Sequence, residues 1–116
     1  MLTEAEKYLG YPYVWGGSSP ATSFDCSGFV SWVINHSGWN VGRLGAQGLY
    51  NICTPTSNPQ PGDLVFFKGT YDTPGVSHCG IYVGDNKMLH CGDPIGYANL
   101  NTSYWQSHFY AYGRLP

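Results

Sequence analysis

The order of the patterned segments in this chain predicts an α+β fold. Helical signals come first: Thr3–Glu6 has the pattern of a capping box before a helix over 4–9, and apolar residues recur at helical spacing over 26–36. After Pro55 the pattern changes to short apolar runs separated by Gly, Pro and Asn, which is typical of strands. Helices followed by such strands favour a helical layer packed on an antiparallel sheet.

The first half of the chain is predicted to hold three helices. The helix over 4–9 ends before a loop over 13–24 that is rich in Gly, Ser and Pro. The helix over 26–36 has an apolar face and ends at a Ser-Gly pair. A third helix over 45–52 has a weaker pattern, because two glycines lie within it or beside it.

The second half of the chain is predicted to hold the sheet. Residues 63–67 form a buried strand, and a closing strand runs over 109–115. Between them, 78–83 and 87–91 form the two arms of a hairpin around Gly84-Asp85-Asn86, which favours a three-residue loop.

Composition limits the classes of function. A chain of 116 residues and 12.7 kDa is one domain, and its 10% charged residues and net charge of −2 argue against a phosphate-backbone binder. No apolar run is long enough to span a membrane. The first residues lack the pattern of a signal peptide, so we expect a cytoplasmic protein or a domain of a longer secreted chain.

Cys26 is the first candidate for chemistry. It stands at the predicted start of the second helix, where unpaired N–H groups and the helix dipole favour the nucleophilic thiolate. A small buried apolar residue is the alternative role for a free cysteine at this position.

His78 and His90 lie in the two arms of the predicted hairpin. With a three-residue loop they point to the same face, whereas a two-residue loop would put them on opposite faces. One of them could then act as a base for Cys26 while the other orients it. The alternative is two unrelated histidines, one of them satisfied in the core.

Cys79 and Cys91 alternate with these histidines and therefore face the core, where they act as small hydrophobic residues. A cross-strand disulfide is the alternative, whereas a His-Cys zinc site fails because neighbours in a strand face opposite sides. Cys53 shows no signal beyond packing. A set of aromatic residues could line a groove or belong to the core: Tyr13, Trp15, Trp32, Trp39, Tyr104 and Trp105.

Five segments resemble, in order and spacing, the motifs of the NlpC/P60 family of cell-wall cysteine peptidases. They are PYVWGG at 12–17, DCSGFV at 25–30, PGDLVFF at 61–67, HCGIYVG at 78–84 and MLH at 88–90. The segment 40–48 also resembles family members. The chain is most similar to the C-terminal peptidase domain of the two-headed wall hydrolases of conjugative transposons, and the resemblance covers nearly all of it.

The resemblance implies a papain-like fold, in which a helix carrying the cysteine packs on an antiparallel, barrel-like sheet. It implies hydrolysis of peptidoglycan stem peptides between γ-D-glutamate and diaminopimelate or lysine, with no metal or other cofactor. In this sequence Cys26 matches the nucleophile, His78 the general base and His90 the residue that orients the base. The implied substrate-binding residues are Tyr13, Asp25 and Ser27 near the nucleophile, and Arg43 and Gln47 on the rim.

The resemblance also implies where the protein works. A lysozyme-like domain precedes the peptidase in these relatives, so we expect 1–116 to be a single peptidase domain of a longer secreted wall protein. The expected partner is a muropeptide, with no nucleic acid and no membrane insertion, and the expected state is a monomer.

Two positions depart from the family pattern. Cys79 stands where Val is usual, and Cys91 stands where Ala or Ser is common. Both are small replacements on the predicted core face, so we expect the site to stay intact. Two alternatives remain: an amidase or acyltransferase on the same fold, and a non-catalytic peptidoglycan-binding module.

Overall fold

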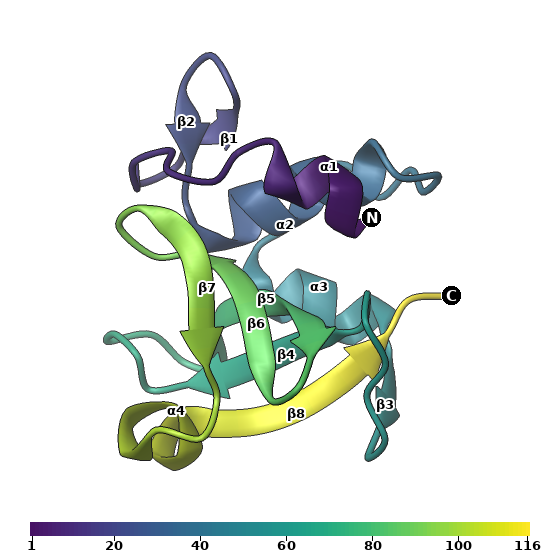
Figure 1. Ribbon diagram of the computed structural model, residues 1–116, viewed down its shortest axis with the longest axis vertical. Helices are drawn as coiled ribbons and strands as arrows, with labels where there is room; N and C mark the ends of the chain where they lie inside the picture. Colours follow the sequence, from purple (N-terminus) through teal and green to yellow (C-terminus); the bar gives the residue numbers. More distant parts are fainter.

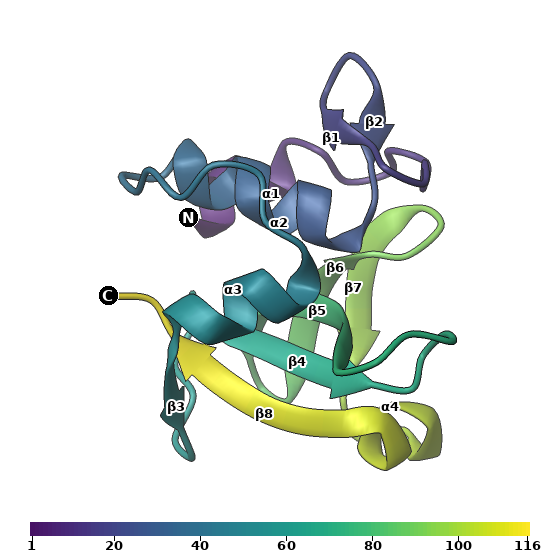
Figure 2. The same cartoon turned by 180° about the vertical axis from the view of Figure 1, so that it is seen from behind.

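The computed structural model describes all residues from 1 to 116, arranged as a helical layer on a curved sheet (Figures 1 and 2). The helical layer contains α1 (Leu2–Glu6), α2 (Cys26–Asn35) and α3 (Ala46–Ile52), and α4 (Ser103–His108) lies at the far end beside β4. This arrangement confirms the predicted α+β class. None of these helices combines the length and the apolar character needed to cross a lipid bilayer.

The sheet has six strands in the order β3-β8-β4-β5-β6-β7, and every neighbouring pair is antiparallel. Its edges, β3 and β7, do not pair with each other, so the sheet is curved but open. The strands are β3 (Thr54–Thr56), β4 (Leu64–Lys68), β5 (Val76–Gly84), β6 (Lys87–Cys91), β7 (Ile95–Asn99) and β8 (Phe109–Arg114). A separate two-stranded hairpin, β1 (Ser18–Ser19) with β2 (Ser23–Phe24), lies within the segment predicted as a loop.

The apolar core lies between the helical layer and the sheet. Phe29 and Ile34 of α2 pack there with Phe66, Ile81 and Leu89 of the sheet, all fully buried. A second, smaller cluster on the opposite face of the sheet contains four buried residues: Val65, Phe67, Met88 and Leu100. The first four residues of β4 are buried on both faces of the sheet and are all apolar, and the strand ends at the exposed Lys68. The result is that α2 is held firmly across β5 and β6.

Helix α1, the two edge strands of the sheet and helix α4 differ from the prediction. Helix α1 begins at Leu2 with Met1 as its N-cap and has no side-chain cap bond, so the predicted capping box is wrong. The carboxylate of Glu4 instead accepts hydrogen bonds from Lys7 and Tyr8, 3.0 and 2.6 Å away. Strands β3 and β7 and helix α4 had no strong local pattern and were not predicted.

The central hairpin also corrects the prediction. Gly84 pairs with Lys87, so the turn has two residues, Asp85 and Asn86, both at positive φ (53° and 56°). A two-residue turn alone would place His78 and His90 on opposite faces. However, the pairing shifts by one residue between Tyr82 and Gly84, and this bulge restores the even register. The predicted common face of the histidines is therefore correct, although the loop length is wrong.

Candidate active site

Cys26 is the first residue of α2, as predicted. Asp25 is the N-cap, and its carboxylate accepts a hydrogen bond from the Gly28 N–H at 2.7 Å. The side chain of Cys26 is only 7% exposed, and its Sγ lies 4.0 Å from the carbonyl oxygen of Ser77 on β5. The thiol is therefore placed between the positive end of α2 and the sheet.

The loop before β1 is packed closely against this helix start. The Gly17 carbonyl accepts a hydrogen bond from the Asp25 N–H at 3.0 Å, and a Cβ atom at Gly28 would overlap that same carbonyl oxygen. A Cβ atom at Gly17 would lie 2.5 Å from the carbonyl oxygen of Ser23. Both glycines are thus required by close backbone approaches, which explains why they occur in the two motifs around Cys26.

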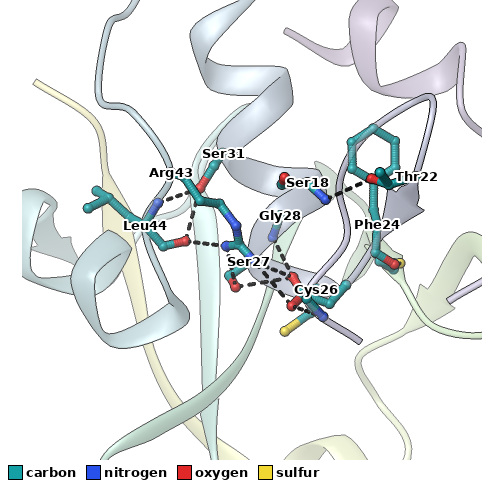
Figure 3. Close-up of polar contacts among 12 residues, drawn as sticks. Ser18, Thr22, Phe24, Cys26, Ser27, Gly28, Ser31, Arg43 and Leu44 are labelled. Carbon is teal, nitrogen blue, oxygen red and sulfur yellow. Dashed lines mark hydrogen bonds and ion pairs between the residues drawn. The ribbon is translucent and has the colours of Figure 1, made fainter. Parts of the chain in front are cut away.

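Asp25, Ser27 and Arg43, three of the predicted substrate-binding residues, form a polar network beside Cys26. Figure 3 shows Ser27 and Arg43 of this network next to Cys26. The Arg43 guanidinium donates to both carboxylate oxygens of Asp25, at 2.9 and 3.0 Å, and to the Ser27 hydroxyl at 2.9 Å. The Asp25 carboxylate also accepts a hydrogen bond from the Gly16 N–H at 3.0 Å. These side chains therefore bind one another and join the Gly16 loop to the first turn of α2.

Gln47, the remaining rim candidate, is a residue of α3. Its Oε1 accepts a hydrogen bond from the Val76 N–H at 2.8 Å, and its Nε2 donates to Asn51 at 3.0 Å. In this position Gln47 anchors the start of β5, two residues before His78. Its contacts in the structure are thus with the chain itself.

His78 and His90 are brought together across β5 and β6. Nε2 of His78 lies 2.9 Å from Nδ1 of His90, within hydrogen-bond distance. Since this bond occupies Nε2 of His78, its Nδ1 is the nitrogen left for Cys26. Burial, together with the nearby charge of His78, lowers the pKa of His90 to about 3. His90 is therefore neutral at physiological pH.

The surroundings of Cys26 favour its thiolate. The pKa of Cys26 is lowered to about 5, first by a hydrogen bond from the Cys79 thiol and then by the neighbouring His78, while burial opposes the shift. Cys79 retains its proton, because the adjacent thiolate and complete burial raise its pKa. Cys79 thus has a polar role in addition to the predicted packing role.

Cys53 and Cys91, unlike Cys26, stay protonated as thiols. Burial raises the pKa of Cys53 to about 11 and that of Cys91 to about 12. Neither forms a disulfide, and Cys91 faces the core together with Cys79, as predicted. No group of three His, Cys, Asp or Glu side chains lies close enough together to hold a metal ion.

Tyr13 lies close to Cys26 and is half-buried. Burial, followed by the nearby charges of Cys26 and Asp25, raises its pKa to about 12, so its hydroxyl keeps a proton. Its backbone N–H donates to the Asp93 carboxylate at 3.2 Å, which ties the Tyr13 segment to the turn after β6. The hydroxyl is therefore a neutral hydrogen-bond donor beside Cys26.

The aromatic residues do not line a single groove. Trp32 stacks on His36 along α2, and Trp39 donates from its ring nitrogen to the carbonyl oxygen of Pro116. Of these six residues only Trp105 contacts the histidine pair, and Phe67 also lies against His78. The sequence did not indicate the Trp105 contact, because α4 has only a weak local signal. The larger surface cavity, about 390 Å³, lies at the tip of β5 and β6 and includes none of the candidate site residues.

Comparison with known proteins places this arrangement in a family. Residues 10–114 match the NlpC/P60 family. The chain is 42% identical to the bifunctional muramidase/DL-endopeptidase CwlT of Bacillus subtilis over 99% of its own length and 36% of that protein. It is 43% identical to the probable endopeptidase p60 of Listeria seeligeri, over 99% of its own length and 22% of that protein. The chain thus spans well under half the length of these relatives.

Solved structures agree with the sequence comparison. An NLP/P60-family protein from Staphylococcus aureus, described as similar to lipoprotein, superposes with a TM-score of 0.94 at 45% identity, covering 98% of this chain and 39% of that one. The NlpC/p60 domain of the peptidoglycan hydrolase SagA superposes with a TM-score of 0.79 at 28% identity, covering 98% of this chain and 95% of that one. The fold, the motifs and these matches together show that the chain belongs to the NlpC/P60 family.

Proposed function

We propose that this domain is a cysteine endopeptidase that cleaves peptidoglycan stem peptides, with Cys26 as nucleophile, His78 as general base and acid, and His90 as the residue that orients His78. The observation that carries the proposal is the Cys26 thiol at the start of α2 beside a histidine whose far nitrogen is bonded to His90. A nucleophile, a base and an orienting group in this order form the general arrangement of nucleophilic catalysis.

The first step is attack by the Cys26 thiolate on the scissile carbonyl. With a pKa of about 5, Cys26 is ionised at neutral pH. In the mechanism proposed here, the proton that the departing amine needs is delivered by His78. As the tetrahedral intermediate collapses, the C–N bond breaks and His78 gives its proton to the departing amine. A water molecule then attacks the thioester, loses a proton to His78, and releases the new carboxyl group and Cys26.

The oxyanion of the intermediate is stabilised by two donors. The backbone N–H of Cys26 is in the first turn of α2, where N–H groups have no intrahelical partner. The Tyr13 hydroxyl remains protonated because its pKa is about 12. Removing one donor of this kind typically costs about 3 kcal/mol of transition-state stabilisation.

The neutral state of His90 determines the tautomer of its partner. His90 with a pKa of about 3 accepts the hydrogen bond from the Nε2–H of His78 through its unprotonated Nδ1. This bond fixes the plane of the His78 ring and directs its Nδ1 toward Cys26.

The relatives support the substrate class. Two of them are named as endopeptidases, one of these as a bifunctional muramidase/DL-endopeptidase, and SagA is named as a peptidoglycan hydrolase. We infer that the substrate is the bond between γ-D-glutamate and diaminopimelate or lysine. The protein then works as a monomer at the cell wall, as a peptidase domain that follows a lysozyme-like domain in a longer secreted chain.

The decisive experiment is a mass-spectrometric digest of diaminopimelate-type and lysine-type peptidoglycan with wild type beside Cys26→Ala. We expect wild type alone to release fragments cut after D-glutamate. Fragments with a free lactyl group would indicate an amidase, and new peptide bonds an acyltransferase. If neither protein cuts any wall but both bind it, the domain is a binding module and the proposal is wrong.

A further inference from the structure

Trp105 of α4 contacts both histidines of the site. Its ring lies nearly parallel to that of His78, with centroids 5.4 Å apart and an interplanar angle of 22°. It meets the ring of His90 edge-on, at 5.2 Å and 85°. One side chain thus borders both partners of the His78–His90 hydrogen bond.

The indole of Trp105 is itself held in place. Its ring lies 4.7 Å from that of Phe67, and it packs on the smaller apolar cluster of the sheet. The helix that carries it is capped by the Thr102 hydroxyl, which accepts a hydrogen bond from the Trp105 N–H at 3.4 Å. The Gln106 side chain donates to the carbonyl of Leu100 at 2.8 Å, which ties α4 to the end of β7.

The stacked geometry has a chemical consequence for His78. In the proposed mechanism His78 is a cation while Cys26 is a thiolate, and its two ring nitrogens are used by Cys26 and His90. Only the ring faces remain for stabilisation, and no carboxylate hydrogen-bonds to either nitrogen. A parallel indole presents its electron-rich face to such a cation and keeps water from it.

We propose that Trp105 is a positioning residue, which holds the rings of His78 and His90 in line with Cys26 and stabilises the charged form of His78. This inference rests on the proposed role of His78 as base for Cys26. It assigns Trp105 no contact with substrate. A merely structural tryptophan would contribute to folding but would leave the pH dependence of Cys26 unchanged.

The charges around the site do not change when Trp105 is replaced. The titratable side chains on the elements packed around His78 are Asp25 and Cys26 at the start of α2, Lys68 of β4, Cys79 and Tyr82 of β5, Lys87, His90 and Cys91 of β6, and Tyr104 and His108 of α4. Since tryptophan is uncharged, any shift in a pH profile reports the contact of its ring rather than the loss of a charge.

The test compares Trp105→Phe with Trp105→Met, which have similar volume but differ in aromaticity. The readout is the rate of Cys26 alkylation by iodoacetamide between pH 4 and 9, measured by peptide mapping. In Trp105→Met we expect the pH midpoint of alkylation to rise by about 0.5–1 unit, since the imidazolium loses its stacking partner. In Trp105→Phe the midpoint should stay near that of wild type.

A matched control is Trp39→Met, because Trp39 is another half-buried tryptophan but contacts the carbonyl of Pro116 instead of the histidines. Its alkylation profile should match wild type. Melting curves of all variants establish that they are folded. If folded Trp105→Met gives the wild-type profile, or if Trp105→Phe shifts as far as Trp105→Met, the proposal is wrong.

Digestion of muropeptides separates this proposal from the proposed function. In Trp105→Met we expect kcat/KM near pH 6 to fall about threefold to tenfold, mainly through kcat. If wild type cuts no wall but the alkylation midpoint still depends on Trp105, the positioning role holds and the peptidase function fails. If wild type cuts and Trp105→Met cuts equally well at every pH, the positioning role fails and the function holds.

Discussion

The two halves of the candidate active site are held in place by different forces. On the helix side, the carboxylate of Asp25 accepts hydrogen bonds from two backbone N–H groups and from Arg43, so charge and polar bonds position Cys26. On the sheet side, a single hydrogen bond joins His78 to His90, and aromatic rings provide the other contacts. The proposed nucleophile, Cys26, is therefore placed by electrostatics, whereas the proposed base, His78, is placed mainly by packing.

The largest expected effect comes from removing a reacting group from either half. Cys26→Ala and His78→Ala should each lower kcat/KM for a muropeptide by on the order of 10⁴-fold or more, because the covalent path needs both groups. Chromatography of the cleaved muropeptide measures this loss. Cys53→Ala serves as the control and should cut at the wild-type rate. Full activity of His78→Ala would show that the base has been assigned to the wrong residue.

The pH profile tests the helix side next. Since the folded protein lowers the pKa of Cys26 to about 5, the thiolate is present above that pH and is lost as the pH falls through it. We expect kcat/KM to fall about tenfold per unit below pH 5. Cys79→Ala removes a group that lowers the pKa of Cys26, so the pH below which kcat/KM falls should rise. Cys91→Ala should leave that pH unchanged. A wild-type midpoint near pH 8 would contradict the assignment.

His90→Asn tests the sheet side. An amide retains an acceptor for the Nε2–H of His78, so we expect kcat/KM to fall roughly tenfold. That loss is well below the about 10²–10⁴-fold that general acid–base catalysis contributes.

His90 also makes the stability of the fold depend on pH. Burial lowers the pKa of His90 from 6.5 to about 3, so between these two pH values the unfolded chain binds more protons than the folded protein. Stability is then fully present above pH 6.5 and declines as the pH falls toward 3. Denaturant titrations should show a flatter decline in His90→Asn, and an unchanged slope would contradict this role.

Gly28→Ala tests the close packing of the helix start. The added Cβ would overlap the Gly17 carbonyl oxygen, so the loop or the helix must shift. We expect a loss of about 1–3 kcal/mol in the free energy of unfolding, measured by denaturant titration. The control is Gly48→Ala in α3, whose Cβ would meet only the Leu44 side chain at an ordinary 3.4 Å. That variant should be neutral or slightly more stable. Equal effects of the two substitutions would refute the packing argument.

Arg43→Lys is expected to have the smallest effect. Lysine keeps the charge but loses the planar fork, in which Nη2 of Arg43 donates to Asp25 while Nη1 donates to Ser27. Because the Arg43 side chain is 38% exposed, solvent screens the pair, and we expect a loss of about 0.5–1 kcal/mol of stability. Thermal melts at low and high salt measure it, and the difference from wild type should shrink as salt increases. If Arg43→Lys instead lowered the free energy of unfolding by several kcal/mol, the Arg43–Asp25 pair would contribute more to the helix side of the site than the exposure of Arg43 indicates.

Local patterns predicted the helix side of the site well. The Asp25-Cys26-Ser27-Gly28 segment indicated a helix start with a thiol at its positive end, and the structure has this feature because N-capping depends on residues adjacent in sequence. The common face of His78 and His90 was also predicted, but the loop length was not. The bulge between Tyr82 and Gly84 compensates for the shorter turn, and a bulge has no reliable local signal.

The contacts of Arg43, Gln47 and Trp105 could not be predicted from sequence patterns. Arg43 and Gln47 were expected on the substrate rim. In the structure the guanidinium of Arg43 donates to Asp25, and the side-chain oxygen of Gln47 accepts from the Val76 N–H. The Trp105 contact depends on α4, a six-residue helix that follows an unpredicted strand. Side-chain partners of this kind come from residues distant in the chain, so spacing alone does not identify them.

The sequence by itself determined the α+β class, the position of the thiol at a helix start and the membership of the NlpC/P60 family, since these depend on short-range spacing and local motifs. The tertiary structure alone decided that Cys79 helps to lower the pKa of Cys26, that His90 is neutral and that Trp105 contacts both rings of the histidine pair. Each of these depends on burial and on contacts between elements far apart in sequence. Those quantities exist only once α2, the sheet and α4 have packed together.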